Sequence, residues 1–181
     1  NYLSKYGTKL HLVNRIKNQK SSLSINYYGL KNLNFLNIKK IIKKANPDYV
    51  FYYASPKIVR NNKKNINKEL FNLYRHYYVT VFYKILNLLK KFEKKIFIFY
   101  PSSVALNEKS TSFKYSKEYR KTKELGERVC KLNFSKKIFP ISYRIDQIKS
   151  PQNYNIAGFY EGSSERILKK YIDNFLIKSH F

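Results

Sequence analysis

Two apolar runs separated by a long amphipathic stretch constrain the fold of this chain more than any other feature. Residues 49–54 and 96–100 are almost continuously apolar, which is typical of strands buried on both faces of a parallel sheet. Between them, residues 66–92 carry apolar side chains at helical intervals, which predicts one long connecting helix. Further predicted strands cover residues 9–13, 22–28 and 138–143, and further predicted helices cover 36–45, 116–132 and 166–177. This alternation predicts an α/β fold with a mostly parallel sheet flanked by helices.

Length and composition are those of a globular domain. The 181 residues suit one domain of ordinary size, and 43% of them are hydrophobic. No apolar run is long enough to span a membrane, so we expect a cytoplasmic protein without a membrane partner. The single cysteine, Cys130, excludes an internal disulfide, and its position within a predicted helix favours a packed thiol. We expect no metal site, since the three histidines are scattered singly.

The formal net charge of +26 arises from 37 basic and 11 acidic residues. Such an excess ordinarily indicates a polyanionic partner such as nucleic acid. Here it is mostly lysine, spread along the chain, and Asn, Ile, Tyr and Phe are abundant as well. These five amino acids are the ones that AT-rich codons favour. We therefore favour mutational bias as the main cause of the charge, with a nucleic acid or an acidic partner as the alternative.

One pair of residues suggests chemistry. Tyr119 and Lys123 are four residues apart, so on a helix they share one face. An ammonium beside a phenol favours the phenolate and lowers the tyrosine pKa. Ser102 and Ser103 follow the strand at 96–100, at the edge where open α/β sheets place their ligands. Together these groups predict a proton-transfer site for a carbonyl or an alcohol. The alternative is that the serines only cap a turn and that the Tyr–Lys spacing arises by chance.

The order of these elements resembles the short-chain dehydrogenase/reductase superfamily, in particular its extended branch of NAD(P)-dependent epimerases and dehydratases. Residues 46–55 (NPDYVFYYAS) are similar to the fourth strand of that family, and 96–105 (IFIFYPSSVA) to the fifth strand with its catalytic serine. Residues 119–127 are similar to the catalytic helix, and 138–144 to the sixth strand. The resemblance covers roughly residues 5–150 and implies a Rossmann-like, doubly wound fold.

The resemblance also implies roles for individual residues. Tyr119 would be the general acid/base, and Lys123 would hold the nicotinamide ribose and lower the tyrosine pKa. Ser103, or Ser102 in its place, would donate a hydrogen bond to the substrate oxygen. The other predicted cofactor-binding residues are Asn14, Arg15, Ala54 and Ser55.

The implied activity is that of an oxidoreductase, epimerase or dehydratase acting on a nucleotide sugar or a similar hydroxyl or keto substrate. The cofactor would be NADP or NAD, and Arg15 favours NADP because an arginine there suits a 2′-phosphate. A homodimer is one possible assembly. In the long helix this family often has an asparagine that supports the active site, and Tyr77 or Tyr78 stands near that place.

The sequence departs from the family at its start. The five glycines do not have the spacing of the phosphate-binding turn between the first strand and the first helix, and there is no methionine. We therefore expect an N-terminally truncated piece that begins within the first helix. Residues 1–150 would form an incomplete dinucleotide-binding domain, and 151–181 the start of a substrate-side segment with a terminal helix. Two alternatives are a non-catalytic basic Rossmann-like module and a fragment without activity of its own.

Overall fold

The computed structural model describes residues 9–14, 25–29, 34–59, 65–107, 115–146 and 164–179. The chain divides into two compact units, Asn1–Pro47 and Asp48–Phe181, which are described here one after the other. The predicted helix end before residue 8, the predicted cofactor residue Arg15 and the predicted domain boundary near residue 150 lie outside the described residues.

The described residues of the first unit form two parallel strands and one helix. The strands β1 (Leu10–Asn14) and β2 (Ile25–Gly29) pair in register, with Asn14 opposite Gly29. The helix α1 (Phe35–Ala45) begins after Asn34, whose side chain accepts a hydrogen bond from the Leu36 amide at 2.9 Å. It ends at Asn46, which adopts the left-handed conformation with φ 42° and is followed by Pro47. The strands and the helix confirm the elements predicted there from sequence, within the described residues.

The second unit is built on a three-stranded parallel sheet. Its strands β3 (Tyr49–Phe51), β4 (Ile96–Ser103) and β5 (Ile138–Ile145) are ordered β3-β4-β5, so β4 is central. The predicted parallel sheet is therefore confirmed here. The strand β3 is shorter than the predicted 49–54, although the Tyr52 amide still donates to the Phe99 carbonyl at 3.0 Å.

The predicted helix over 66–92 forms as a continuous helical stretch whose middle is widened. It consists of α2 (Lys68–Arg75), a π-helix η2 (His76–Val81) and α3 (Phe82–Leu89). The side chain of Asn67 caps its start by accepting a hydrogen bond from the Leu70 amide at 3.0 Å. Within η2, the carbonyls of Tyr77 and Tyr78 accept hydrogen bonds from the hydroxyls of Tyr52 and Tyr100, at 2.5 and 3.1 Å. Tyrosine hydroxyls thus supply partners to backbone carbonyls in the widened turn.

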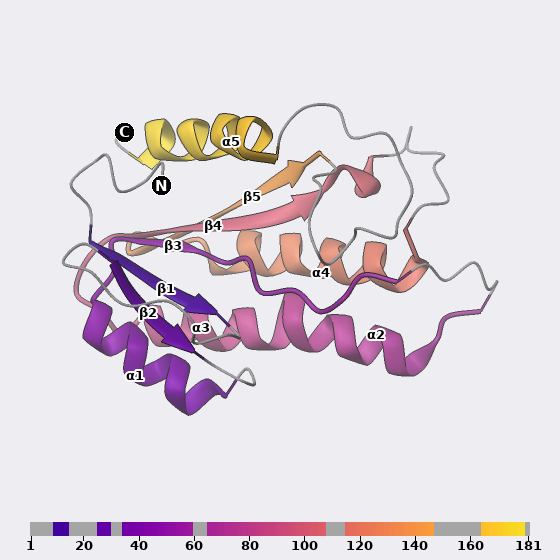
Figure 1. Ribbon diagram of the computed structural model, residues 1–181, viewed down its shortest axis with the longest axis horizontal. Coiled ribbons are helices and arrows are strands. Elements are labelled where there is room, and N and C mark those ends of the chain that lie inside the picture. Colours follow the sequence, from indigo (N-terminus) through magenta and orange to yellow (C-terminus); the bar gives the residue numbers. More distant parts are fainter. Residues whose placement is uncertain are drawn as a thin grey trace. The chain divides into compact units, whose positions relative to one another are not determined.

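Helices cover both faces of the β3–β4–β5 sheet, as Figure 1 shows. On one face lies α5 (Ser164–Ser179), whose Phe175 packs against Phe51 and Phe99 with ring centres 5.4 Å apart in each case. On the other face, Phe82 of α3 packs against Tyr100 with ring centres 4.6 Å apart. Successive side chains of β4 therefore alternate between two cores. Among the described residues, no helix combines the length and the apolar character needed to cross a membrane.

The helix α4 (Lys117–Asn133) packs on the same face of the sheet as α3. Ser116 caps its start by accepting a hydrogen bond from the Tyr119 amide at 3.2 Å. Gly126 lies where the Tyr100 side chain meets the helix, and a Cβ added to it would clash with the Tyr100 hydroxyl and ring. The absence of a side chain at Gly126 therefore allows β4 and α4 to approach each other closely.

We predict that Gly126→Ala lowers the free energy of unfolding. Overpacking against Tyr100 destabilises the fold by about 1–3 kcal/mol, whereas the better helix propensity of alanine stabilises it by at most about 1 kcal/mol. Urea denaturation followed by circular dichroism measures the difference, with Lys121→Ala at an exposed position of α4 as the control. An increase in stability for Gly126→Ala would contradict the close approach, because it is the result expected from propensity alone.

Candidate active site

Tyr119 and Lys123 lie one turn apart on the buried face of α4 and reach the carboxyl end of β4. The Lys123 ammonium donates a hydrogen bond to the Pro101 carbonyl at 2.6 Å. The Ser103 hydroxyl lies near the Tyr119 phenol, where it acts to lower the pKa of Tyr119. Ser103 is the last residue of β4. Its hydroxyl accepts a hydrogen bond from the Ala105 amide at 3.2 Å and so caps the start of the short helix η3 (Val104–Leu106). Three of the four predicted catalytic side chains are thus brought together.

The ring of Tyr119 is held by other aromatic rings. Tyr74 and Tyr78 meet it edge to face, with ring centres 5.9 and 5.7 Å away. Tyr115 stacks on it with ring centres 5.1 Å apart. Tyr119 is only 5% exposed. The neighbouring tyrosines therefore hold its ring in place.

Lys123 is surrounded by tyrosine rings although it carries an ionisable amine. Its side chain is 6% exposed, and Nζ lies 4.0 Å from the ring centre of Tyr78. The ring centres of Tyr100 and Tyr119 are 5.4 and 5.7 Å from Nζ. Burial lowers the pKa of Lys123 to about 7, and the nearby carboxylate of Glu127 opposes this only in part. The amine therefore changes its charge near neutral pH.

The expected lowering of the Tyr119 pKa is wrong for this structure. Burial raises the pKa of Tyr119 well above its ordinary value, and the nearby Ser103 hydroxyl lowers it only in part. The same burial weakens the charge of Lys123, which was expected to stabilise the phenolate. Because burial penalises each charged form, the site favours a neutral phenol.

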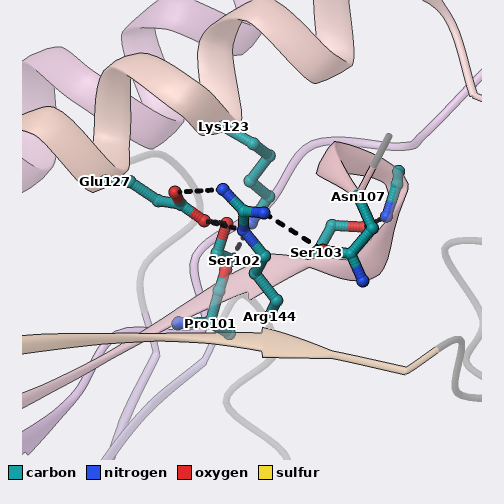
Figure 2. A network of polar contacts seen from close by, with 8 residues as sticks. Pro101, Ser102, Ser103, Asn107, Lys123, Glu127 and Arg144 are labelled. Carbon is teal, nitrogen blue, oxygen red and sulfur yellow. Dashed lines mark hydrogen bonds and ion pairs between the residues drawn. The ribbon is translucent and has the colours of Figure 1, made fainter. Parts of the chain in front are cut away.

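The side chain of Ser102 has different partners from that of Ser103. Its hydroxyl donates to Glu127 Oε1 at 2.6 Å. The Arg144 guanidinium donates to both oxygens of Glu127, at 2.9 and 3.0 Å, and to Asn107 Oδ1 at 3.0 Å. Figure 2 shows Arg144 between Glu127 and Asn107, with Lys123 descending from α4 beside them. The geometry therefore favours Ser103 over Ser102 as the hydroxyl that serves Tyr119.

Glu127 and Arg144 were not predicted as site residues. Glu127 follows Lys123 by four residues, so the spacing that pairs Tyr119 with Lys123 also places Glu127 on that face. Arg144 lies opposite Ser102 in the register between β4 and β5. The helical spacing was a usable signal for Glu127, whereas the position of Arg144 depends on strand register.

Three other predicted cofactor-binding residues, Asn14, Ala54 and Ser55, are described by the structure, whereas Arg15 lies outside the described residues. Ala54 and Ser55 belong to the segment after β3, where the Ser55 hydroxyl is 2.6 Å from the Tyr78 hydroxyl. Asn14 is the last residue of β1 in the first unit. In the described parts of the chain, no group of three or more His, Cys, Asp or Glu side chains could hold a metal ion.

Comparison with known proteins gives no family assignment. No protein-family model matches the chain, and no curated protein matches it. Membership of the short-chain dehydrogenase/reductase superfamily therefore stays a prediction.

We predict that Glu127→Gln destabilises the protein at neutral pH and that the loss disappears in acid. Although burial alone would raise it, hydrogen bonds from Arg144 and Ser102 bring the pKa of Glu127 below its ordinary value of 4.5. A carboxylate with a lowered pKa stabilises the folded state above that ordinary value, and this stabilisation is lost as pH falls through the folded pKa. We expect a loss of about 1 kcal/mol near pH 7, because half-exposed Arg144 is screened by solvent.

Urea denaturation of both proteins between neutral and acidic pH measures this difference. Glu124→Gln is the matched control, since Glu124 pairs with Arg128 at an exposed position of the same helix. A pH-independent difference for Glu127→Gln would contradict an ionised Glu127.

Proposed function

We propose that this chain carries the Tyr–Lys–Ser site of an NAD(P)-dependent oxidoreductase of the short-chain dehydrogenase/reductase type. Its substrate would be a hydroxyl or keto compound such as a nucleotide sugar, on which related chemistry performs epimerisation or dehydration. The single observation that carries the proposal is the gathering of Tyr119, Ser103 and Lys123 at the carboxyl end of β4, where the Lys123 ammonium donates to the Pro101 carbonyl. Parallel α/β sheets bind their ligands at this edge.

The arrangement of the strands supports a Rossmann-like, doubly wound fold as part of this proposal. Both sheets are parallel, and helices cover both faces of β3–β4–β5. In the proposed fold, β1 and β2 correspond to the second and third strands, and β3, β4 and β5 to the fourth, fifth and sixth. The observed neighbours agree with the order 3-2-1-4-5-6 in each unit taken by itself.

The donor set fits the nicotinamide ribose half of a dinucleotide. Lys123 supplies an amine and Ser103 and Tyr119 supply hydroxyls, all at one strand end. When bound, the cofactor would supply or accept the hydride. Lys123 would exchange the Pro101 carbonyl for ribose hydroxyls, which are also hydrogen-bond acceptors. The sequence has no glycine-rich phosphate turn, so this half of the cofactor is the part that the described residues would recognise.

In this mechanism Tyr119 acts as a general acid. Its raised pKa keeps the phenol protonated at neutral pH, ready to donate to a carbonyl oxygen. Ser103 would donate a second hydrogen bond to the same oxygen as it gains negative charge. A protonated phenol favours the reduction of a ketone. Oxidation of an alcohol would require Tyr119 to lose its proton, which a charged Lys123 would assist.

A second candidate function is binding of single-stranded nucleic acid by a non-catalytic basic module. The outward face of α4 favours it. The exposed basic residues of this helix are Lys117, Arg120, Lys121, Arg128 and Lys131. Glu124 is the exposed acidic residue among them and pairs with Arg128. Such binding would fall steeply with added salt, because each phosphate contact releases counterions.

We predict that the chain binds NADPH and that Lys123→Met weakens this binding by about tenfold or more, because a hydrogen bond to a charged amine is lost. Lys121→Met removes the same charge from an exposed position of α4 and should bind like the unaltered chain. The affinity should decrease as pH rises through about 7, since Lys123 is charged only below its pKa. Titration calorimetry at several pH values measures these effects.

Several outcomes distinguish the two functions. Measurements at about 0.15 M ionic strength limit the general attraction of anions to a chain of charge +26. Equal weakening by Lys121→Met and Lys123→Met would assign NADPH binding to charge alone. Tight, strongly salt-dependent binding of a single-stranded oligonucleotide, without specific NADPH binding, would favour the second function. NADH measured in parallel tests the preference for NADP expected from Arg15.

We predict that Tyr119→Phe lowers the rate of NADPH oxidation by about 10²–10⁴-fold, the range for loss of a general acid, and leaves NADPH affinity unchanged. The assay follows NADPH absorbance with a panel of ketones that includes keto nucleotide sugars. Ser102→Ala should lower the rate much less than Ser103→Ala, since the Ser102 hydroxyl is committed to Glu127. Undiminished turnover in Tyr119→Phe, or binding of NADPH without turnover of any ketone, would remove the catalytic role.

A further inference from the structure

Tyr78 touches the candidate active site from a helix that carries none of the predicted catalytic residues. It lies in the π-helix η2 and is 1% exposed. Its ring meets Tyr119 edge to face with ring centres 5.7 Å apart. Its hydroxyl and its ring also contact Ser55 and Lys123, which belong to different elements.

The hydroxyl of Tyr78 connects η2 to the segment after β3. It is 2.6 Å from the Ser55 hydroxyl, and either oxygen can be the donor. The backbone of Tyr78 is held separately, because its carbonyl accepts a hydrogen bond from the Tyr100 hydroxyl at 3.1 Å. The side chain of Tyr78 thus reaches the segment after β3, while its backbone in the widened turn is bonded to β4.

The ring of Tyr78 lies against the Lys123 amine. Nζ is 4.0 Å from the ring centre, within the range of a cation–π interaction. Tyr100 of β4 and Tyr119, Glu127 and Cys130 of α4 also face or influence this amine. Glu127 directs both carboxylate oxygens to Arg144. Lys123 is held instead by the Pro101 carbonyl and the face of Tyr78.

We propose that Tyr78 is a positioning residue of this site: its ring holds the Lys123 ammonium at the end of β4, and its hydroxyl ties Ser55 to the same place. The second half of the proposal, which concerns Ser55, rests on the proposed function, because Ser55 and Lys123 would contact the same ligand only if that ligand is a dinucleotide. Tyr78 then couples the cofactor segment after β3 to the lysine of α4. A ring and a hydroxyl are both needed, and tyrosine supplies both.

Two variants separate these halves. Tyr78→Leu removes the ring and the hydroxyl, whereas Tyr78→Phe removes only the hydroxyl. Tyr83→Leu is the matched control, since Tyr83 lies on the adjoining helix α3 and is 47% exposed. Lysine labelled with ¹³C at Cε allows NMR titration of Lys123, which is assigned by loss of its signal in Lys123→Met. We expect this signal to titrate near neutral pH, unlike that of an ordinary lysine.

We expect Tyr78→Leu to lower the pKa of Lys123 by about one further unit, because loss of the ring destabilises the charged amine. Tyr78→Phe and Tyr83→Leu should leave that pKa unchanged. Tyr78→Phe should weaken NADPH binding by about three- to tenfold, through loss of the hydrogen bond to Ser55. If Tyr78→Leu does not fold, pentafluorophenylalanine at position 78 keeps the shape of the ring and reverses its quadrupole, and it should lower the same pKa.

An unchanged Lys123 pKa on removal or reversal of the ring overturns the first half of the proposal, whether or not NADPH binds. Full NADPH affinity in Tyr78→Phe overturns the second half. A chain that shows the Lys123 shift but binds no dinucleotide retains the first half, and it loses both the second half and the proposed function. The titration needs no cofactor, so the two failures are distinguishable.

Discussion

The close packing of α4 against β4 is the constraint on which the candidate site depends. Gly126 admits the Tyr100 side chain to the surface of α4. Lys123, about one turn earlier, reaches the Pro101 carbonyl, and Tyr119, one turn before that, reaches Ser103. Toward the start of α4, the residues that touch β4 are Gly126, Lys123 and Tyr119. Their partners on β4 run toward the carboxyl end of that strand, from Tyr100 through Pro101 to Ser103. A change that separated the helix from the strand would therefore disperse all of them together.

Burial decides the charge state of the site more than neighbouring charges do. It raises the pKa of Tyr119 and lowers that of Lys123, so it favours the neutral form of both groups. Glu127 is the contrasting case on the same helix face, because hydrogen bonds from Arg144 and Ser102 outweigh its burial and keep it ionised. A neutral phenol and an amine that is partly charged at neutral pH thus lie beside a charged pair. Lys123 is the group among them whose charge a ligand could change near neutral pH.

Local patterns in the sequence predicted the elements well, and non-local contacts account for what they missed. The helical periodicity predicted α1, α4 and α5 closely, whereas β4 continues past its predicted end at Tyr100, through Pro101, to Ser103. The helical stretch 68–89 was predicted as one helix, since its apolar stripe does not reveal the widened turn at η2. The direction of the Tyr119 pKa was wrong, because a four-residue spacing reports a neighbouring lysine but not the burial of both groups. The pairing of Glu127 with Arg144 depends on the register of β4 and β5, which brings Ser102 opposite Arg144.

The position of Lys123 bears on how the large positive charge should be interpreted. A biased codon composition can place lysine at solvated positions at little cost, and exposed Lys117, Lys121 and Lys131 of α4 are of this kind. Burying an amine carries a desolvation penalty, so lysine is seldom found in a core unless something holds it there. Lys123 lies on the same helix at 6% exposure, between a carbonyl and the face of a tyrosine. Composition is sufficient to account for its exposed neighbours, whereas the buried position of Lys123 calls for a specific cause, and the proposed role at the end of β4 would supply one.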